Sequence, residues 1–374
     1  MAPIKVGIIG YGFSTKCFHL PFIRPNSDLQ VYAFLQRAAT PADVKSPWGH
    51  CTVEFPQAKH YTTPDQFFAD AEIELVVICT HEHEEFARRA LESGKHVVVE
   101  KPFVTTSEAA ERLIQLARKQ NRVLTAFHNR RFDSDFRTLQ HLVSQNALGD
   151  IREAELHYDF PNPGWIGGWT GKYTPGEGMA FGLGTHTVDQ ALTLFGTPTS
   201  VTGFLRANRD NAGESDIDDS FTIILQYGGD KKKLLVTVKT TIVSNLKDQL
   251  KFFVRGTEGS FIKFGTDPQE AKAIASPGQP ALSPTFGDEL PAAWGTLTTI
   301  TQFDASQSLD SDSKKWIGKY PSLPGWYRGY YEGVVAAIKG EKEVYVKAET
   351  AGDGLKVIEL ARRSAEEGVT LKWE

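Results

Sequence analysis

Apolar residues in the first third of the chain fall into five short runs separated by amphipathic segments. The runs span residues 4–9, 30–35, 75–79, 97–99 and 123–127. Continuous apolar runs this short, rich in β-branched residues, are typical of strands that are buried on both faces. Residues 84–92 and 108–119 instead repeat apolar positions at helical spacing. This alternation predicts a parallel, doubly wound sheet.

The pattern changes after Phe127, where the predicted strands follow one another with short turns between them. They span residues 151–160, 201–207, 218–227, 233–240, 250–254 and 260–264. Successive strands joined by turns such as Gly228-Gly229-Asp230 indicate an antiparallel sheet. Helices are predicted at residues 134–146, 183–195, 327–338 and 348–366. Residues 268–322 are rich in Pro, Gly, Ser and Asp, and they are predicted to form a long surface excursion.

The two patterns divide the chain into two predicted domains. Residues 1–127 are interpreted as a nucleotide-binding α/β domain, and residues 128–374 as a larger α+β domain. A chain of 374 residues can bury a core in each without a disulfide or a metal.

Composition excludes several classes of protein. With 40% hydrophobic and 23% charged residues, the whole chain is neither disordered, collagen-like nor a coiled coil. Its 41 basic and 46 acidic residues give a net charge of −5, which argues against nucleic acid or a membrane surface as a partner. No apolar run approaches the roughly 18 residues of a membrane span.

The cysteines and the first residues bear on the compartment. Cys17, Cys51 and Cys79 are widely spaced, so they indicate neither a metal cage nor a disulfide framework. The first predicted strand begins at Ile4 and leaves no room for a signal peptide. We therefore expect a cytoplasmic protein with reduced thiols and no metal site.

A glycine turn follows the first predicted strand directly and opens a helical stretch. Residues 10–15 read GYGFST. In a dinucleotide-binding turn the first glycine permits a tight bend, and the second lets the backbone approach the pyrophosphate at a helix N-terminus. The third glycine position, which favours close helix–strand packing, is occupied here by Thr15. The context after a strand strengthens a motif that is weak by itself.

The end of the second predicted strand bears on which dinucleotide is bound. An acidic residue at this position would bind a ribose 2′-hydroxyl, but here the chain has Gln36 followed by Arg37. A guanidinium pairs with a 2′-phosphate and stacks on adenine. NADP(H) is therefore favoured over NAD(H), with a solvated surface arginine as the alternative interpretation.

The run Glu100-Lys101-Pro102 lies at the carboxyl end of a predicted central strand. In an open parallel sheet that edge forms the ligand crevice. A lysine there could polarise a carbonyl group or relay the proton of an alcohol. A structural lysine paired with a carboxylate is the competing interpretation.

Several separated motifs resemble one enzyme family. Residues 94–97 (GKHV) lead into Glu100-Lys101-Pro102 after the glycine turn, and this order resembles the glucose-fructose oxidoreductase / inositol dehydrogenase / MocA family. Four further segments are similar to its scyllo-inositol dehydrogenase branch: residues 18–21 (FHLP), 128–136 (HNRRFDSDF), 184–190 (GTHTVDQ) and 261–265 (FIKFG). The likeness covers nearly the whole chain.

The resemblance implies a fold, a reaction and an assembly. It implies an N-terminal Rossmann domain and a C-terminal domain with an open, mostly antiparallel sheet that mediates dimers or tetramers. It also implies hydride transfer to or from sugars, inositols and related polyols, with Lys101 and His186 as the catalytic residues facing the nicotinamide. His186 is expected to exchange a proton with a pKa near the working pH.

Two sets of site residues follow from the motifs and the resemblance. The cofactor-binding set comprises Gly10, Gly12, Phe13, Ser14, Thr15, Arg37, Thr80, His83, Glu100 and Lys101. The substrate-binding set comprises Asn129, Arg130, Trp169 and Asp189. Asp189 has a structural helix acid as its competing interpretation. The aromatic cluster of Trp165, Trp169 and Tyr173 could form a wall for a sugar face or simply pack a satellite core.

The chain departs from the family pattern at two places. Inositol-type members carry an aspartate four residues before the helix histidine, and here that position is Gly182. After the fourth strand, the family reaches a histidine five residues beyond a threonine, whereas here His83 follows Thr80 after three. A metal site at His81 and His83 is rejected because no third ligand is in view.

These observations predict an NADP(H)-dependent oxidoreductase acting on a secondary alcohol or ketone of a small sugar, inositol or polyol. The missing aspartate keeps two alternatives open. The first is a regulator that binds dinucleotide without turnover, as some members of the family do. The second is a reductase of a less polar carbonyl compound or of an imine.

Overall fold

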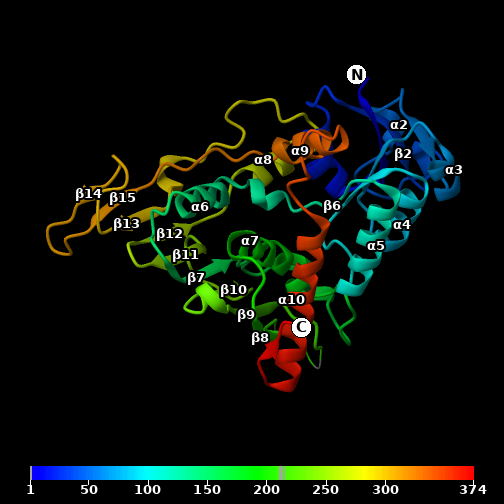
Figure 1. The fold of residues 1–374 in the computed structure, drawn as a ribbon. Helices are drawn as coiled ribbons and strands as arrows, with labels where there is room; N and C mark the ends of the chain where they lie inside the picture. The colour runs from blue at the N-terminus through cyan, green and yellow to red at the C-terminus, as the bar shows by residue number, and fades with distance from the viewer. Residues whose placement is uncertain (1, 210–212, 214) are drawn as a thin grey trace.

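A six-stranded parallel sheet forms the N-terminal part of the chain, as Figure 1 shows in blue and cyan. The computed structural model describes residues 2–209, 213 and 215–374. The strand order is β3-β2-β1-β4-β5-β6, with every neighbouring pair parallel. The strands are β1 (Ile4–Ile9), β2 (Leu29–Leu35), β3 (Lys59–Tyr61), β4 (Leu75–Ile78), β5 (His96–Val99) and β6 (Leu124–Ala126).

Both faces of this sheet are covered, as the continuous apolar runs predicted. Val97 and Val99 of β5 pack into the cluster formed with helices α3 (Pro64–Ala69), α4 (His83–Glu92) and α5 (Ser107–Gln120). Val98, which points the other way, packs with α1 (Leu20–Ile23) and α9 (Arg328–Ile338). Alternate residues of a strand face opposite sides, so a strand buried on both sides must be apolar at every position.

The remainder of the chain builds a ten-stranded sheet that is mostly antiparallel. Its order is β14-β15-β13-β12-β11-β7-β10-β9-β8-β16, and only β7 and β10 run parallel among the described pairs. The strands are β7 (Ile151–His157), β8 (Ser200–Arg206), β9 (Ser220–Gln226), β10 (Leu235–Thr240), β11 (Leu250–Gly256), β12 (Gly259–Phe264), β13 (Thr296–Thr299), β14 (Ser308–Leu309), β15 (Trp316–Lys319) and β16 (Leu371–Lys372).

Helices cover one face of the second sheet. They are α6 (Ser134–Ser144), α7 (Thr185–Phe195) and α10 (Ala348–Glu367). α10 runs between the two sheets and packs against both α5 and β8 (Figure 1). Gly203 of β8 permits this approach, because a Cβ there would lie 2.0 Å from the carbonyl oxygen of Ala361. The opposite face of the sheet is open and exposes Phe204, Leu235 and Phe264.

The prediction for residues 268–322 is wrong. That segment is not a surface excursion, because it contains helix α8 (Gln269–Ala275) and the strands β13, β14 and β15, which extend the second sheet at one end. These strands are two to four residues long and carry Ser, Thr, Gly and Lys, so they lack the apolar alternation that sequence reasoning detects.

Several predicted boundaries also move. The helix expected over residues 134–146 ends at Ser144, and the strand expected over 151–160 ends at His157. The helix expected from residue 183 is preceded by a π-helical turn, Ala180–Gly184, before α7 begins. No helix among the described residues is long and apolar enough to cross a membrane.

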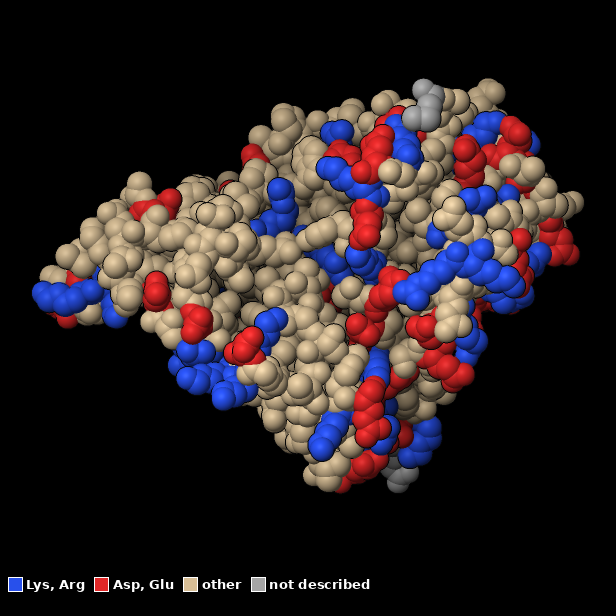
Figure 2. Space-filling view, in the orientation of Figure 1, with Lys and Arg blue, Asp and Glu red and all other residues tan. Residues whose placement is uncertain are grey.

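Surface charge is mixed in sign over the N-terminal part of the chain. In Figure 2, basic and acidic side chains are interspersed on this side of the molecule. Arg88, for example, pairs with Glu85 and Glu92 along α4, and Arg112 pairs with Glu108 on α5. Interleaved pairs of this kind give a solvated helix face rather than a field of one sign.

Candidate active site

The glycine turn after β1 has the geometry that its sequence predicted. Gly10 has φ +94°, and a Cβ there would lie 2.9 Å from Cγ2 of Thr80, so only glycine fits. A Cβ at Gly12 would meet nothing within 4 Å, which leaves the backbone open to a ligand. Thr15, at the third glycine position, donates its hydroxyl to the carbonyl of Gly10 at 3.0 Å. The departure at Thr15 therefore fastens the turn instead of blocking it.

The carboxylate of Glu100 joins this turn to the end of β5. It accepts hydrogen bonds from the hydroxyl of Ser14, from Nε2 of His19 at 3.3 Å and from the backbone N–H of Lys101 at 2.6 Å. Burial alone would raise the pKa of Glu100, but the hydrogen bond and the positive charge of His19 lower it to about 2. Glu100 is thus a buried carboxylate that positions its neighbours.

His19 carries the matching positive charge. Its Nδ1 lies 2.6 Å from the hydroxyl of Tyr331, on α9. Burial would lower the pKa of His19, but interactions with Cys79 and Glu100 outweigh burial and raise the pKa to about 9. The imidazolium therefore links the glycine turn, the end of β5 and a helix contributed by the C-terminal part of the chain.

Lys101 extends from the end of β5 to the start of α7. Its Nζ donates to the carbonyl oxygen of Gly182 at 3.2 Å. The structure thus gives this lysine a carbonyl partner, unlike the carboxylate partner of the competing interpretation. The peptide bond between Lys101 and Pro102 is cis. The ammonium lies half-buried between the two sheets, beside the turn that precedes His186.

His186 is buried on the first turn of α7. Its ring centroid lies 6.2 Å from that of His128 and 6.3 Å from that of Tyr158, and its Nδ1 has no hydrogen-bond partner. Burial, followed by the charge of Lys101, lowers the pKa of His186 well below its ordinary value. This direction differs from the expectation of a pKa near the working pH, and it favours the neutral imidazole.

Gly182 offers room where the family pattern has an aspartate. It lies in the π-helical turn, and a Cβ there would meet no atom within 4 Å. The absent side chain leaves space, while the carbonyl oxygen of the same residue binds Lys101. The departure thus removes a potential acceptor carboxylate and leaves the backbone carbonyl as the acceptor at this position.

Two of the predicted substrate residues are held by other protein groups. The guanidinium of Arg130 hydrogen-bonds the hydroxyl of Tyr158, pairs with Glu270 and lies 3.3 Å from Asp133. Asp189 forms a two-point ion pair with Arg131, at 2.7 and 2.8 Å. These contacts account for the structural interpretation of Asp189, and they leave substrate binding by either residue a prediction.

Asn129 and Trp169 lie on the segments that flank this region. Asn129 is buried and opens the short 3-10 helix Asn129–Phe132 after β6. Trp169 packs partly against the core and against Trp165, and its carbonyl accepts from Nη2 of Arg209 at 2.7 Å. The structure thus gives Trp169 a packing role, and contact with a substrate remains a prediction.

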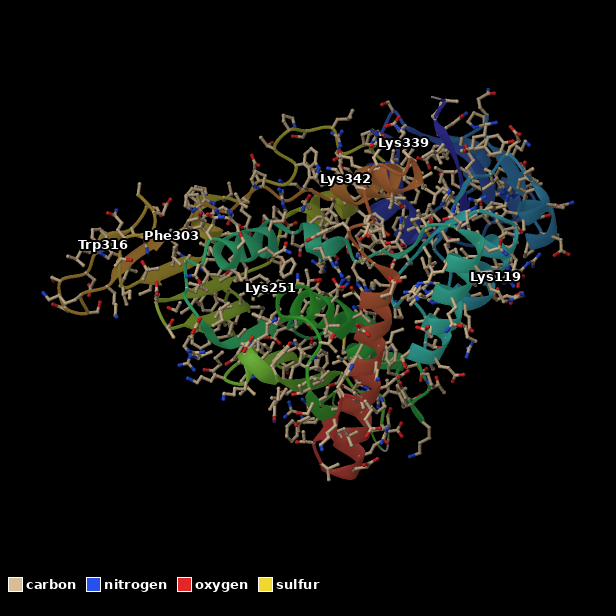
Figure 3. All side chains as sticks on the ribbon, in the orientation of Figure 1. Lys119, Lys251, Phe303, Trp316, Lys339 and Lys342 are labelled. Atoms are coloured by element: carbon tan, nitrogen blue, oxygen red, sulfur yellow. The ribbon has the colours of Figure 1, made fainter. Side chains whose placement is uncertain are left out.

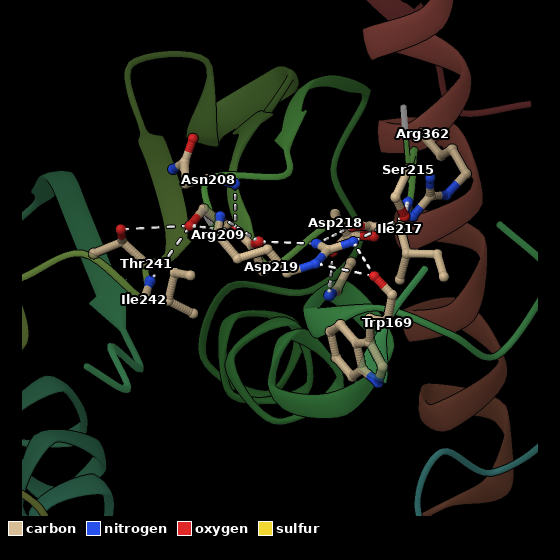
Figure 4. A network of polar contacts seen from close by, with 12 residues as sticks. Trp169, Asn208, Arg209, Ser215, Ile217, Asp218, Asp219, Thr241, Ile242 and Arg362 are labelled. Carbon is tan, nitrogen blue, oxygen red and sulfur yellow. Dashed lines mark hydrogen bonds and ion pairs between the residues drawn. The ribbon is translucent and has the colours of Figure 1, made fainter. Parts of the chain in front are cut away.

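A buried ion-pair network fixes the loop that ends in the π-helical turn (Figure 4). Arg209 pairs with Asp219 at 2.9 Å while it holds the Trp169 carbonyl. The neighbouring Asp218 accepts from the backbone N–H of Ala180 at 2.8 Å and pairs with Arg362 of α10. The turn that presents Gly182 is therefore anchored to the second sheet and to α10.

The remaining cofactor residues lie along the carboxyl edge of the first sheet. Arg37 follows β2 directly and pairs with Glu82 at 2.8 Å, with 80% of its side chain exposed. His83 opens α4 and donates from Nδ1 to the carbonyl of Pro102 at 2.7 Å. Phe13 is 41% exposed, and Oγ1 of Thr80 is buried without a partner.

These residues fit a dinucleotide. The turn is open at Gly12, a helical stretch begins behind it, and Arg37 stands free of burial at the end of β2. An orphaned hydroxyl at Thr80 borders Gly10 and lacks the partner that a ligand would supply. The same edge leads from the glycine turn to Lys101.

The described residues contain one group with metal-ligand chemistry, away from Lys101. His50, Cys51 and His60 have ligand atoms within 4.8 Å of one another. Nε2 of His50 lies 3.0 Å from the carbonyl of Ala38, and Nε2 of His60 lies 3.0 Å from that of Gln36. Burial raises the pKa of Cys51 to about 11, which keeps the thiol protonated. The group is therefore a set of hydrogen-bonded side chains.

Sequence reasoning missed several residues of this region. They are His19, His128, Arg131, Tyr158 and Lys251, and all are buried. Tyr158 and Lys251 fell inside predicted strands, where no periodic signal marks a residue as part of a site. His128 and Arg131 stood in a quoted motif beside Asn129 and Arg130. Only the fold shows that His128, Tyr158 and Lys251 lie near His186. It also shows that His19 lies beside Glu100 and that Arg131 pairs with Asp189.

Comparison with known proteins assigns both parts of the chain to one oxidoreductase family. Residues 4–128 match the model of an oxidoreductase family with an NAD-binding Rossmann fold, and residues 136–262 match that of the GFO/IDH/MocA C-terminal domain. The chain is 32% identical over 373 residues to scyllo-inositol 2-dehydrogenase (NADP(+)) IolW of Bacillus subtilis, covering 99% of this chain and 96% of the relative.

Two further similarities extend over the full length. The uncharacterized oxidoreductase C115.03 of Schizosaccharomyces pombe is 36% identical over 379 residues, with 100% of both chains covered. The solved structure of the oxidoreductase YvaA from Bacillus subtilis has a TM-score of 0.87 at 31% identity, covering 100% of this chain and 99% of that one.

Proposed function

The chain belongs to the GFO/IDH/MocA family of NAD(P)-binding oxidoreductases, and from this we propose that it interconverts a secondary alcohol and a ketone with NADP(H). The proposed substrates are small sugars, inositols or related polyols. One observation carries the proposal: Lys101, from the first sheet, meets the turn before His186, from the second, through the carbonyl of Gly182. A proton-exchanging pair at such a junction is what alcohol–ketone chemistry requires.

The two side chains divide the proton chemistry between them. A bound nicotinamide dinucleotide supplies or accepts the hydride. In the oxidation direction the neutral imidazole of His186 accepts the hydroxyl proton, and the ammonium of Lys101 stabilises the developing alkoxide. In the reduction direction the Lys101 ammonium polarises the carbonyl, and the proton returns to the oxygen from the imidazolium. The unprotonated nitrogen of His186 can accept this proton, although burial and the charge of Lys101 lower its pKa.

NADP(H) is the proposed form of the cofactor. Gln36 and Arg37 occupy the end of β2, and Arg37 is exposed, so its guanidinium is available for a 2′-phosphate. Its present partner, Glu82, is also exposed and would be exchanged for the phosphate. The name of the relative IolW, which includes NADP(+), agrees with this assignment.

The domain division and the assembly are further parts of the proposal. Residues 1–127 would form the dinucleotide-binding domain, and residues 128–374 the substrate-binding and oligomerisation domain. The open face of the second sheet, with Phe204, Leu235 and Phe264 exposed, is the surface proposed to join copies into a dimer or tetramer.

The competing proposal is a dinucleotide-binding regulator without turnover, and the absent carboxylate at Gly182 is the observation in its favour. Two measurements on the purified protein separate the two. Fluorescence titration with NADPH and NADH measures cofactor binding, and a panel of polyols, ketones and aldehydes followed by NADPH absorbance measures turnover. Turnover of any member supports the enzyme, whereas NADPH binding without turnover across the panel supports the regulator.

A further inference from the structure

Buried polar atoms without a hydrogen-bond partner gather around His186. They include Nδ1 of His128, Nδ1 of His186, Oε1 of Gln190, both carboxylate oxygens of Asp135 and Nζ of Lys251. Folded proteins pair nearly all such atoms, so a concentration of unpaired ones at one place calls for an explanation. A bound ligand would supply the missing partners. Among these atoms, Nζ of Lys251 is the most informative about a ligand, because it belongs to a buried ammonium group.

Lys251 is turned into this region by a β-bulge. Pairing between β11 and β12 passes from Leu250 opposite Phe264 to Phe252 opposite Lys263, which leaves Lys251 as the extra residue. Strict alternation from the inward Phe252 would place Lys251 on the open face of the sheet. Instead its side chain is only 2% exposed. A bulge re-aims a side chain in this way, and bulges are frequent beside active sites.

The ammonium of Lys251 and the ring of His186 both lie near Tyr158. Nζ of Lys251 is 4.8 Å from the centroid of the Tyr158 ring, and that ring is 6.3 Å from the ring of His186. The guanidinium of Arg130 lies over the same tyrosine ring at 4.4 Å. Figure 3 places Lys251 in the interior between α6 and α7. Lys251 thus approaches the site from the second sheet, as Lys101 does from the first.

Some charged groups around this site lack a partner at hydrogen-bond distance. Arg130 pairs with Glu270, Arg131 with Asp189 and Lys263 with Glu289. Lys101 and Lys251 form no ion pair with a carboxylate among the described residues, although the charges of Asp135 and Asp133 act on Lys251 and raise its pKa against burial. Burial lowers the pKa of Lys251, which shows that its charge is costly without a partner.

We propose that Lys251 binds the substrate and that the substrate carries a carboxylate, so that the preferred class is a polyhydroxy acid or its keto form. The proposal rests on the function proposed above for the position of the reacting carbon between Lys101 and His186. An ammonium offers three donors and no acceptor. The family's acceptor carboxylate is absent at Gly182, so the site offers donors where an inositol-type site offers an acceptor.

Binding measurements test this directly with named probes. Glucuronate, galacturonate and gluconate are compared with glucose, galactose and glucitol by thermal shift and calorimetry on the NADPH-loaded protein. At least one acid is expected to bind at least tenfold tighter than its neutral counterpart. Lys251→Met should remove that preference, and Lys251→Arg should keep part of it. Equal binding of acids and neutral sugars by the natural protein would overturn the proposal.

Two controls separate substrate binding from a structural role. Lys239→Met, on β10, tests the same substitution on a half-exposed lysine and should leave the preference intact. If Lys251 were only the counter-ion of Asp135, Lys251→Met would lower the melting temperature and a further Asp135→Asn would restore it. The proposal expects instead that Lys251→Met leaves the melting temperature nearly unchanged, because the desolvation cost of the buried ammonium is removed together with its attraction to Asp135 and Asp133.

Kinetics distinguish a failure of this inference from a failure of the proposed function. If a carboxylate substrate is turned over, Lys251→Met should raise its KM at least tenfold with a smaller change in kcat. If nothing is turned over but acids still bind through Lys251, the enzymatic function fails while the binding site stands. If polyols are turned over and Lys251→Met changes neither KM nor acid preference, the site assignment fails and the function stands.

Discussion

The cofactor end and the substrate end of the candidate site are built in opposite ways. Around the glycine turn the ionised groups satisfy one another: Glu100 accepts from Ser14, from His19 and from the backbone of Lys101. Around His186 the reverse holds, because Lys251 and His186 each present a buried nitrogen without a partner. The cofactor end leaves the hydroxyl of Thr80 for a ligand, whereas the substrate end leaves a buried ammonium.

This difference between the two ends matches the two kinds of ligand proposed for them, a cofactor common to many enzymes and a particular substrate. A cofactor shared by many enzymes can be met by a rigid turn whose geometry is fixed by protein contacts alone. A particular substrate is selected by groups that remain unsatisfied until it binds, since an analogue without the matching atoms leaves them unpaired. The substitutions below test whether the two ends are as separable as the contacts indicate.

Lys101→Ala should have the largest effect. Removing the ammonium deprives the developing alkoxide of its charge partner, so kcat should fall by about 10²–10⁴-fold. NADPH affinity should change little, because the turn is held by Glu100 and His19 without the lysine side chain. Steady-state kinetics and fluorescence titration measure the two quantities. Lys119→Ala, on exposed α5, is the control, and full activity in Lys101→Ala would refute the catalytic assignment.

Gly182→Asp should shift the substrate end toward polyols. A Cβ there meets no atom within 4 Å, so the carboxylate can be accommodated and can accept from a substrate hydroxyl. A hydrogen bond to a charged group contributes about 1.5–3 kcal/mol, equivalent to roughly a 10–100-fold rise in kcat/KM for inositol. Gly182→Asn, which has nearly the same shape without the charge, is the control. An unchanged preference between inositol and acids would show that this position does not select the substrate.

Arg37→Ala tests the outer part of the cofactor end. The guanidinium is exposed and pairs only with exposed Glu82, so its removal should not disturb the fold. NADPH affinity should fall by about tenfold or more, because a charge-assisted bond to the 2′-phosphate is lost, while NADH affinity stays the same. Arg88→Ala, another exposed arginine paired with glutamates, is the control. Equal losses for both cofactors would remove Arg37 from 2′-phosphate recognition.

Most of the first sheet could be predicted from the sequence because its signals are local. Strands such as Leu75–Ile78 are apolar at every position, and Gly10 and Gly12 lie within three residues of each other. The cofactor-binding residues could therefore be predicted from three local features: the first strand, the glycine turn and the residues that follow the next strands. The short strand Lys59–Tyr61 escaped because it is polar and lies at the edge.

The substrate end could not be predicted in the same way because its contacts join distant residues. Lys251 lies on another strand than the segment that carries Tyr158, and a β-bulge turns its side chain toward that ring. The pattern of apolar positions does not predict such a bulge. The pKa of His186 was also misjudged, since its burial and its distance from Lys101 exist only in the folded chain. Motif position identified His186, and its protonation state depended on the fold.

The smallest expected effect is a pH dependence of stability from the buried pair of Glu100 and His19. The pKa of Glu100 is lowered to about 2, so its contribution is complete above its unfolded pKa and is lost as the pH falls from about 4.5 toward 2. The pKa of His19 is raised to about 9, so its contribution is complete below about 6.5 and is lost as the pH rises toward 9. The melting temperature should therefore be highest between about pH 5 and 6.5, and Glu100→Gln should flatten both the acidic and the alkaline limb of the profile.

The control is Glu72→Gln, which removes an exposed carboxylate paired with Lys5. The alkaline limb of the profile should remain in this variant. If the alkaline limb is lost in Glu72→Gln, the pH dependence arises from surface charge and not from Glu100 and His19.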